Sequence, residues 1–331
     1  MKSSSLLRTR ILGTGSYLPE RVLSNEDLEK IVDTTHDWIL ERTGIRERRI
    51  ASEKEATSDL AYVAAERALE MAGMKASALD LILVATATPD MIFPSTACIV
   101  QDRLQAKRAF AFDISAACSG FVYGLSVADQ FLRSGQYTAI IVIGAEVLSR
   151  FVDWQDRSTC ILFGDGAGAA VLGAERGERG ILSTRLHSDG GLWDLLSIPG
   201  GGSRHPASDR MLRDRLPYVK MRGNETFKVA VNTLVEVAEE ILEHHHLHPE
   251  DIGLLIPHQA NLRILQAVAK KMNLPMGKVM IDLDRYGNTS AASVPIAMDE
   301  ANREGRIREN DLVLLEAFGG GLTWGAALIR W

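Results

Sequence analysis

Short apolar runs alternate regularly with helical segments between residues 57 and 144. The expected strands cover residues 79–85, 109–114 and 139–144. The expected helices cover residues 57–73, 94–104 and 118–135. This β-α-β-α-β order is typical of a parallel sheet with helices on its faces. Ligands bind at the carboxyl ends of the strands in such sheets, which is where Cys118 falls.

The second half of the chain repeats this alternation. Its expected helices cover residues 224–244, 261–272 and 290–303. Its expected strands cover residues 252–256, 279–283, 312–317 and 326–331. A polar run at 173–180 separates the two series, so we expect an α/β protein of two similar halves, 1–177 and 178–331. The shared architecture indicates an internal duplication packed face to face, without a convincing repeat of individual residues.

Two glycine-rich segments resemble nucleotide-binding loops but favour other structures. Residues 10–19 form an expected strand in which Gly13 and Gly15 indicate a turn with close backbone packing. A dinucleotide-binding loop is disfavoured because the third glycine is missing. Residues 163–172 contain no lysine at a phosphate-loop position, which favours a tightly packed strand.

Three further segments have less regular patterns. A helix is expected over residues 24–33. Residues 37–49 are expected to form a loop, whose basic and aromatic side chains suit either contact with an anion or a solvated surface. Residues 187–217 are rich in Gly, Pro, Arg and Asp and predict a long irregular loop, which in compact domains is often functional.

Composition narrows the class of protein. The formal net charge of −6 argues against a general nucleic-acid binder. No apolar run approaches the roughly 20 residues needed to span a bilayer, and residues 1–8 lack the apolar core of a signal peptide. We therefore expect a cytoplasmic protein without a membrane contact.

The cysteines and histidines do not form a metal-binding pattern. Three widely spaced cysteines indicate reduced thiols rather than a disulfide framework or zinc site, and Cys98 and Cys160 lie in apolar contexts typical of packing. In the cluster from His244 to His248, only these two residues share a helix face. We expect no metal and no bound cofactor.

Cys118 lies at or next to the start of a helix. Unpaired N–H groups and the positive partial charge of a helix N-terminus favour a thiolate over a thiol and can hold an oxyanion. An interaction of up to ~2 kcal/mol would lower the pKa of the thiol by roughly 1 to 1.5 units. The alternative is a buried cysteine that serves only in packing.

Two junctions in the second half match the position of Cys118. His258 follows the strand at 252–256, and Asn288 precedes the helix at 290–303. If the two halves stack, these residues meet Cys118 at one pocket, as a nucleophile with two hydrogen-bond donors. Taken alone, the histidine is more often structural and the asparagine beside Gly287 more often a turn residue.

Six short motifs, in order along nearly the whole chain, resemble those of the β-ketoacyl-acyl-carrier-protein synthase III family. They are Trp38-Ile-x-x-Arg42-Thr-Gly-Ile-Arg-Glu-Arg48, Ala116-Ala-Cys118-Ser-Gly-Phe121, Phe163-Gly-Asp-Gly-Ala-Gly168, His258-Gln-Ala-Asn261, Gly287-Asn-Thr-Ser-Ala-Ala-Ser293 and Phe318-Gly-Gly-Gly-x-Thr-Trp-Gly325. The resemblance implies a thiolase-like fold of five layers, αβαβα, with mixed, mostly parallel sheets. It also implies an acyltransferase that starts bacterial fatty-acid synthesis.

The resemblance implies a decarboxylative condensation in two stages. Cys118 takes the acyl group of a short acyl-CoA, while the backbone N–H groups of Cys118 and Gly320 hold the oxyanion. His258 and Asn288 then bind the thioester oxygen of malonyl-acyl-carrier protein as CO₂ leaves, because donors fixed there stabilise the developing enolate. Phe318 forms an apolar wall that disfavours the carboxylate. The carbanion attacks the acyl group on Cys118.

The resemblance also assigns binding residues. Those for the CoA thioester are Trp38, Arg42 and Arg157 at the nucleotide, and Gly223, Phe227 and Asn261 along the pantetheine tunnel. Stacking with a guanidinium suits a nucleotide phosphate. Those for the acidic carrier protein are Lys228, Arg263, Lys270 and Lys271. Phe93 is expected to cap the acyl pocket of the partner subunit in a homodimer.

Two other readings stay open. A related Cys-His-Asn condensing enzyme of secondary metabolism would use other thioesters to make a ketone, quinolone or polyketide precursor. A catalytically silent acyl-binding protein is disfavoured by the intact set of Cys118, His258 and Asn288. Acyl length is not fixed by the motifs, because one methylene changes binding by only ~1–3 kcal/mol.

Overall fold

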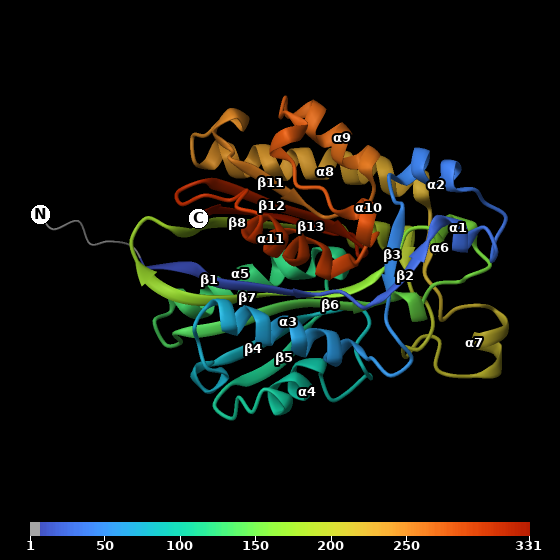
Figure 1. Ribbon diagram of the computed structural model, residues 1–331, viewed down its shortest axis with the longest axis horizontal. Helices are drawn as coiled ribbons and strands as arrows, with labels where there is room; N and C mark the ends of the chain where they lie inside the picture. Colours follow the sequence, from blue (N-terminus) through green and yellow to red (C-terminus); the bar gives the residue numbers. More distant parts are fainter. Residues whose placement is uncertain (1–6) are drawn as a thin grey trace, which may run out of the picture.

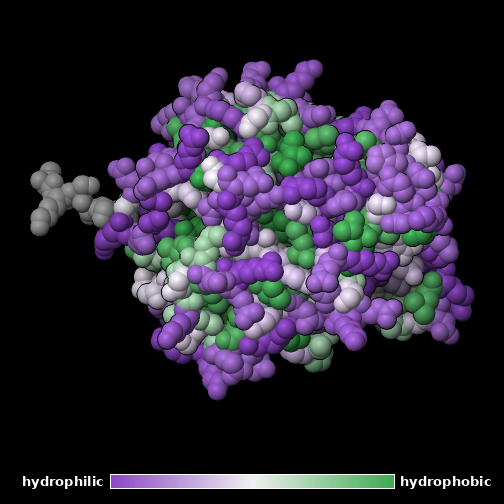
Figure 2. All heavy atoms as spheres, viewed as in Figure 1, coloured by the Kyte–Doolittle hydropathy of each residue, from purple (hydrophilic) through white to green (hydrophobic). Residues whose placement is uncertain are grey.

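The computed structural model describes residues 7–331, which form two main β-sheets with helices outside and between them (Figure 1). Most of the segment 1–8, discussed above for signal sequences, lies outside the described residues. Within residues 7–331, every helix is too short or too polar to cross a lipid bilayer. On the face in Figure 2, hydrophilic side chains cover most of the surface and hydrophobic ones form separate patches.

The first sheet has the strand order β1-β7-β6-β4-β5. Its strands are β1 (Leu7–Tyr17), β4 (Leu81–Ala85), β5 (Phe110–Ile114), β6 (Ala139–Val147) and β7 (Asp165–Arg176). β4 pairs in parallel with β5 and β6, whereas β7 is antiparallel to β6 and β1. The parallel centre expected from the alternation is confirmed.

The second sheet has the order β11-β12-β13-β8. Its strands are β8 (Gly180–Ser188), β11 (Leu254–Pro257), β12 (Leu312–Gly319) and β13 (Thr323–Arg330). Only β11 and β12 are parallel within it. Two small ribbons complete the strands, β2 (Arg21–Ser24) with β3 (Glu47–Ile50) and β9 (Leu196–Ser197) with β10 (Lys220–Met221).

The helices lie in three layers around these sheets and in the connections. The α-helices are α1 (Asn25–Leu28), α2 (His36–Thr43), α3 (Thr57–Met71), α4 (Thr96–Arg103), α5 (Gly120–Arg133), α6 (Arg157–Cys160), α7 (Asp209–Arg213), α8 (Gly223–His244), α9 (Leu262–Lys271), α10 (Leu283–Tyr286) and α11 (Ser293–Arg303). The 3₁₀ turns are η1 (Ala76–Ala78), η2 (Ala117–Ser119), η3 (Leu148–Arg150), η4 (Gly190–Leu195), η5 (Pro249–Asp251), η6 (Met276–Lys278) and η7 (Ser290–Ala292).

Alternate side chains of each sheet face different helix layers. On β4, Leu83 packs with α5 and α11 in the middle of the molecule, whereas Val84 packs with α3 on the outside. On β12, Leu315 faces the middle layer and Leu314 faces α8 and α9. Helices α5 and α11 lie between the sheets, α3 and α4 cover one outer face, and α8 and α9 cover the other (Figure 1). The expected five-layer arrangement is confirmed.

The expected loop at 37–49 is wrong. Most of it is helix α2 and strand β3, because Thr35 caps the helix by accepting a hydrogen bond from the N–H of Trp38. Gly44, with a φ of 80°, ends the helix, and β3 then pairs with β2. Tertiary pairing between short segments decides their structure here.

Other expectations needed correction at element boundaries. The strand expected at 279–283 is absent from the described structure, where Val279 makes a single bridge to Leu255 and α10 begins at Leu283. The helix expected at 24–33 is only the short α1. The irregular loop at 187–217 contains η4, β9 and α7.

Gly13 and Gly15 lie in strand β1 rather than in a turn. Their expected close packing is present, because a Cβ atom at either position would overlap the backbone of α3. The glycine-rich segment at 163–172 largely forms the buried strand β7. There a Cβ atom on Gly168 would overlap α11 from the other side. Glycines on neighbouring strands therefore let helices from both layers approach the first sheet closely.

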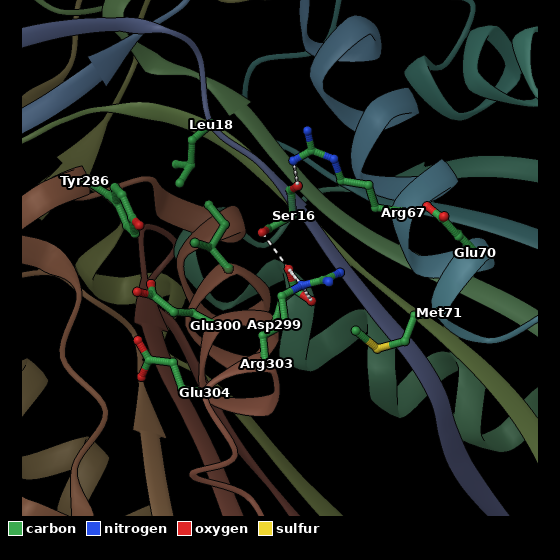
Figure 3. Close-up of a pocket in the computed structure, with 11 residues that line it drawn as sticks. Ser16, Leu18, Arg67, Glu70, Met71, Tyr286, Asp299, Glu300, Arg303 and Glu304 are labelled. Carbon is green, nitrogen blue, oxygen red and sulfur yellow. Dashed lines mark hydrogen bonds and ion pairs between the residues drawn. The ribbon is translucent and has the colours of Figure 1, made fainter.

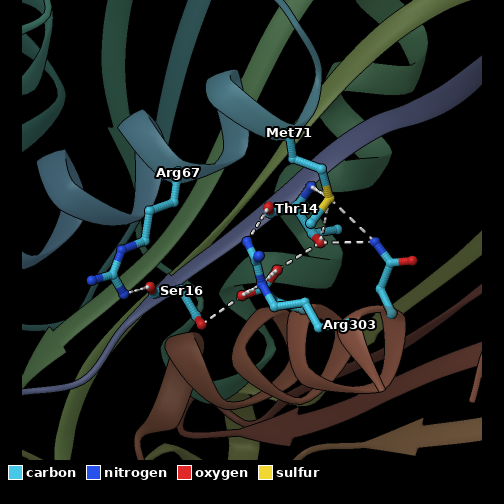
Figure 4. Close-up of polar contacts among 7 residues, drawn as sticks. Thr14, Ser16, Arg67, Met71 and Arg303 are labelled. Atoms are coloured by element: carbon cyan, nitrogen blue, oxygen red, sulfur yellow. Dashed lines mark hydrogen bonds and ion pairs between the residues drawn. The ribbon is translucent and has the colours of Figure 1, made fainter. Parts of the chain in front are cut away.

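A buried carboxylate connects α11 to the first sheet. Asp299 accepts hydrogen bonds from the hydroxyls of Thr14 (2.8 Å) and Ser16 (2.7 Å) and forms an ion pair with Arg303 (3.0 Å) (Figure 4). This network borders a cavity of about 650 Å³ between β1, α3 and α11 (Figure 3). None of the residues predicted to act on substrate lines this cavity. The hydrogen bonds of Asp299 join α11, in the second half of the chain, to β1 in the first.

Candidate active site

A second cavity of about 650 Å³ brings together most of the predicted site residues. Those that line it are Trp38, Arg42, Cys118, Gly223, Phe227, Lys228, His258, Asn261, Arg263, Asn288 and Phe318. They come from both halves of the chain. The thiol, the imidazole and the carboxamide thus share one cavity, as the matched junctions predicted.

Cys118 lies in η2, between the end of β5 and the start of α5. The preceding residue, Ala117, has a φ of 44°, an uncommon value for a residue other than glycine. This turn directs the chain into the middle helix layer, where Cys118 is only 5% exposed. A strained backbone next to a buried nucleophile is typical of functional sites.

The prediction of a lowered thiol pKa is wrong. Burial raises the pKa of Cys118, the Ser290 side chain lowers it and the Glu146 carboxylate raises it, so that the net change is from 9.0 to about 12. A rise of this size corresponds to about 4 kcal/mol, roughly twice what a helix N-terminus can supply. Cys118 is therefore a thiol at neutral pH, and its attack on a thioester requires a proton acceptor.

His258 is held as a neutral donor. Its backbone N–H donates to the carbonyl of Glu316 (2.8 Å), and burial lowers the pKa of the ring to about 3. Its Nδ1 lies 2.6 Å from Oγ of Ser293, an oxygen that also accepts from the N–H of Gln259 (3.4 Å). We infer that the Ser293 hydroxyl donates to Nδ1, which leaves the hydrogen on Nε2.

Asn288 is oriented by the turn that follows it. Its Oδ1 accepts the N–H of Ser290 at 2.8 Å, so the Nδ2 amide hydrogens stay available to the cavity. Its own backbone N–H donates to Leu162 (2.8 Å), and its carbonyl accepts from Gly164 (3.0 Å). The amide is thus fixed at both backbone and side chain.

A smaller cavity of about 160 Å³ meets the larger one at Cys118. Cys118, Ser290 and Gly320 line it together with the apolar side chains of Leu148, Phe163, Leu196, Ile198 and Val219. A Cβ atom on the neighbouring Gly319 would lie 2.6 Å from the backbone nitrogen of Cys118. Glycine at 319 therefore allows the β12–β13 connection to approach the nucleophile.

Trp38 lines the larger cavity, and its ring lies close to two cations. The guanidinium of Arg42 is 4.4 Å from the centre of the Trp38 ring, and that of Arg157 is 4.6 Å from it. Arg157 also donates to the carbonyl of Asp33 (2.9 Å) and does not itself line the cavity. An aromatic ring with two guanidinium groups suits a nucleotide phosphate.

Asn261 has a structural contact besides lining the cavity. Its Oδ1 caps α9 by accepting from the N–H of Arg263 (2.9 Å), and its Nδ2 donates to the carbonyl of Arg42 (3.0 Å). On the adjoining wall, the Arg263 guanidinium lies 5.8 Å from the ring of Phe227. The cap thus connects α9 to α2 at the cavity.

Besides Arg157, three predicted residues line neither cavity. Lys270 and Lys271 are at the last turn of α9, two helical turns beyond Arg263, and Lys271 donates to Asn232 (2.8 Å). Phe93 is 82% exposed at the tip of the β4–α4 connection. These residues do not meet substrate within one subunit.

Sequence reasoning missed the supporting residues of the site. Ser290 and Ser293 belong to the quoted Gly287–Ser293 motif, but only the fold shows what they contact. The sequence did not point to Glu146, because the strand that carries it was expected to end at residue 144 and instead ends at Val147. Gln259 was quoted in a motif without a role, and its side chain joins the carbonyls of Pro257 (2.8 Å) and Met280 (3.1 Å).

Within residues 7–331, no group of three or more His, Cys, Asp or Glu side chains is arranged to hold a metal ion. The cysteines in this part of the chain are free.

Sequence comparison identifies relatives of nearly full length. The family described as 3-oxoacyl-[acyl-carrier-protein (ACP)] synthase III matches residues 112–190, and its C-terminal part matches residues 242–331. The β-ketoacyl-[acyl-carrier-protein] synthase III of Alkalilimnicola ehrlichii is 56% identical over 97% of this chain and 99% of its own. That of Xanthomonas campestris is 54% identical over 99% of this chain and all of its own.

Solved structures agree. The 3-oxoacyl-[acyl-carrier-protein] synthase III of Aquifex aeolicus is 53% identical, with a TM-score of 0.91 over 98% of this chain and 100% of its own. The priming β-ketosynthase of the R1128 polyketide pathway is 35% identical, also with a TM-score of 0.91, over 99% and 98% of the two chains. On this evidence the chain belongs to the β-ketoacyl-acyl-carrier-protein synthase III family of condensing enzymes.

Proposed function

We propose that this enzyme condenses a short acyl-CoA primer with malonyl-acyl-carrier protein to give 3-ketoacyl-acyl-carrier protein, CoA and CO₂, the first condensation of fatty-acid synthesis. The observation that carries the proposal is the meeting of Cys118, His258 and Asn288 in one cavity with Trp38 and Arg42. The identity of 54–56% to β-ketoacyl-acyl-carrier-protein synthases III supports it.

In the first stage, Sγ of Cys118 attacks the thioester carbon of acyl-CoA and CoA leaves. The N–H groups of Cys118 and Gly320 stabilise the oxyanion, since Gly319 lets the end of β12 lie against η2. Trp38, Arg42 and Arg157 bind the nucleotide, while Gly223, Phe227 and Asn261 flank the pantetheine arm.

In the second stage, the malonyl thioester oxygen accepts hydrogen bonds from Nε2 of His258 and Nδ2 of Asn288. Loss of CO₂ leaves an enolate, and these two donors stabilise the negative charge that collects on its oxygen. The buried ring of Phe318 gives an apolar wall that disfavours the carboxylate. The carbanion then attacks the acyl carbon on Cys118.

The small cavity at Cys118 limits the primer. Its volume of about 160 Å³ is close to that of an apolar cavity that holds benzene, so an acyl chain of up to roughly six carbons fits. Its lining is mainly apolar, which suits a hydrocarbon chain. We expect acetyl to short branched primers to react and long chains to be excluded.

The basic residues on α8 and α9 and the exposed side chains at 92 and 93 support two protein partners, an acidic carrier protein and a second copy of the chain. Lys228, Arg263, Lys270 and Lys271 form a basic patch on α8 and α9 of an otherwise acidic protein, which favours the docking of an acidic carrier protein. The exposed tip of Ile92 (84%) and Phe93 (82%) is suited to burial against a second copy of the chain. We infer a homodimer in which Phe93 reaches the acyl cavity of the partner.

We also propose a division of the chain into two halves, a location in the cell and the absence of a bound cofactor. The chain divides at 177/178 into one half that carries Cys118 and one that carries His258 and Asn288, and all strands of each main sheet come from one half. We place the enzyme in the cytoplasm, and we expect CoA thioesters to be substrates without any bound cofactor. The role in secondary metabolism is less favoured, because identity to the polyketide-priming enzyme is lower, at 35%.

Two measurements test the proposal. Radiolabelled acetyl-CoA should label wild-type enzyme but not the Cys118→Ala variant; equal labelling of both would support a silent acyl-binding protein. Turnover with a series of acyl-CoA primers should then favour malonyl-acyl-carrier protein over malonyl-CoA. A strong preference for malonyl-CoA would instead support the polyketide-type role.

A further inference from the structure

A fully buried carboxylate lies behind the nucleophile. Glu146, on β6, accepts hydrogen bonds from the hydroxyl of Thr88 (2.6 Å) and from the N–H of Ala87 (3.1 Å). Its Oε1 also accepts the hydroxyl of Ser290, at 3.1 Å. The condensation proposed above gives Glu146 no role, although its charge acts on the Cys118 thiol.

Ser290 connects the carboxylate to the thiol. Cys118 and Ser290 line the same small acyl cavity, and the turns η2 and η7 that carry them contact each other. Because the Ser290 hydrogen is donated to Glu146, its oxygen is left to accept the hydrogen of the thiol. This arrangement offers the thiol proton of Cys118 a path through Oγ of Ser290 to Oε1 of Glu146.

The backbone is shaped to make this path short. Ser290 has a φ of 49°, and the turn η7 packs directly on β6. A Cβ atom on Gly144 would overlap the carbonyl of Ala291, so glycine at 144 allows η7 to approach the strand that carries Glu146. These features place the Ser290 hydroxyl beside a buried carboxylate that lies 144 residues away in the sequence.

We propose that Glu146 accepts the proton of Cys118 through the Ser290 hydroxyl during acylation and returns it after condensation. The inference rests on the proposed function. In acylation, the S–H bond breaks as the new S–C bond forms. The thiol proton passes to Ser290, the Ser290 proton passes to Glu146, and CoA departs as a thiolate that takes a proton from water.

Condensation reverses the transfer. The enolate carbon bonds to the acyl carbon, the bond between that carbon and Sγ breaks, and the thiolate of Cys118 recovers a proton from Ser290 as Glu146 gives its own back. Burial raises the pKa of Glu146 to about 7, so it can hold and release a proton near neutral pH. Each cycle therefore ends with the thiol and carboxylate restored.

The test separates the two half-reactions in the full-length enzyme. Acylation is measured by single-turnover labelling with radiolabelled acetyl-CoA, and decarboxylation by release of CO₂ from malonyl-acyl-carrier protein without primer. For Glu146→Gln and Ser290→Ala we expect acylation to slow by about 100-fold or more, as for loss of a general base. Decarboxylation should stay within about threefold, because His258 and Asn288 keep their contacts.

Ser290→Ala tests the same proton path if the Glu146→Gln variant fails to fold. Alanine is already present at a φ of 44° at position 117, and the N–H of residue 290 still holds Asn288. The matched control is Ser149→Ala, which removes a hydroxyl donor (2.6 Å) from another buried carboxylate, Asp165, away from Cys118. This control should acylate at the wild-type rate.

The outcomes are distinct. Acylation of both variants within threefold of wild type overturns the inference, as does an equal loss of both half-reactions, which would indicate a structural role. A wild-type enzyme that is never labelled on Cys118 overturns the proposed function and this inference together.

Discussion

The junctions before α5 and α11 have the same backbone design and carry different chemistry. Each is a 3₁₀ turn that leads into a middle-layer helix, and each contains a non-glycine residue at positive φ, Ala117 at 44° and Ser290 at 49°. The two turns contact each other. The first carries the thiol, whereas the second carries hydrogen-bond donors and orients its neighbours. Two turns of similar geometry thus present different side chains, a thiol in one and a hydroxyl in the other.

Removal of the nucleophile tests this division most strongly. Cys118→Ala should abolish labelling by acyl-CoA and all condensation, because the hydroxyl of Ser290 cannot replace a thiolate in the same place. Primer-independent decarboxylation of malonyl-acyl-carrier protein should persist, since its donors, His258 and Asn288, lie outside the turn that carries Cys118. Loss of both reactions, with the melting temperature unchanged, would show that the two junctions do not act separately.

Removal of a donor from the second junction should give the opposite pattern. Asn288→Ala removes one of two hydrogen bonds to the enolate oxygen, and loss of such a donor typically slows a reaction by about 10²–10³-fold. We expect that loss in CO₂ release, with acylation of Cys118 reduced by less than about fivefold. Stopped-flow release of CO₂ and single-turnover labelling of the same preparation measure the two effects.

Ser293→Ala should also slow decarboxylation, but by less than Asn288→Ala does. Without the hydroxyl that donates to Nδ1, His258 is free to place its hydrogen on either nitrogen, and we expect decarboxylation to slow by about 10-fold. The expected signature is a lower kcat with little change in KM for the malonyl substrate. An unchanged kcat would mean that the backbone alone orients the ring.

Two buried glutamates, Glu146 and Glu316, differ in their hydrogen bonding, and the difference should appear in the pH dependence of the free energy of unfolding. Glu146 receives donors on both oxygens, whereas neither oxygen of Glu316 has a hydrogen-bond partner within the described residues. Burial raises the pKa of Glu316 from 4.5 to about 8. The folded state therefore binds more protons than the unfolded state between these values, and stability falls as pH rises through that range.

Glu316→Gln should remove this pH dependence, because the amide does not titrate. The unfolding free energy of the variant relative to wild type should increase between pH 5 and pH 9, by at most about 5 kcal/mol. Urea unfolding at both pH values measures it. Parallel pH profiles for variant and wild type would contradict the raised pKa.

The sequence predicted the site better than its surroundings. Cys118, His258 and Asn288 follow from apolar periodicity and motif order, because each lies where a regular element begins or ends. The helix α2 and the missing strand at 279–283 were not predictable in this way, since a capping Thr35 and a single bridge from Val279 depend on neighbours distant in sequence. Short segments are decided by tertiary contacts more than by their own pattern.

The sequence by itself determined the family, through six short motifs in order along the chain, and that resemblance implied the layer order and the three proposed site residues. Only the tertiary structure decided their ionisation and orientation. Burial, rather than the helix end, sets the protonated thiol of Cys118, and contacts from Ser293 and Ser290 set the ring of His258 and the amide of Asn288. Desolvation and long-range hydrogen bonds exist only once the two halves have packed together.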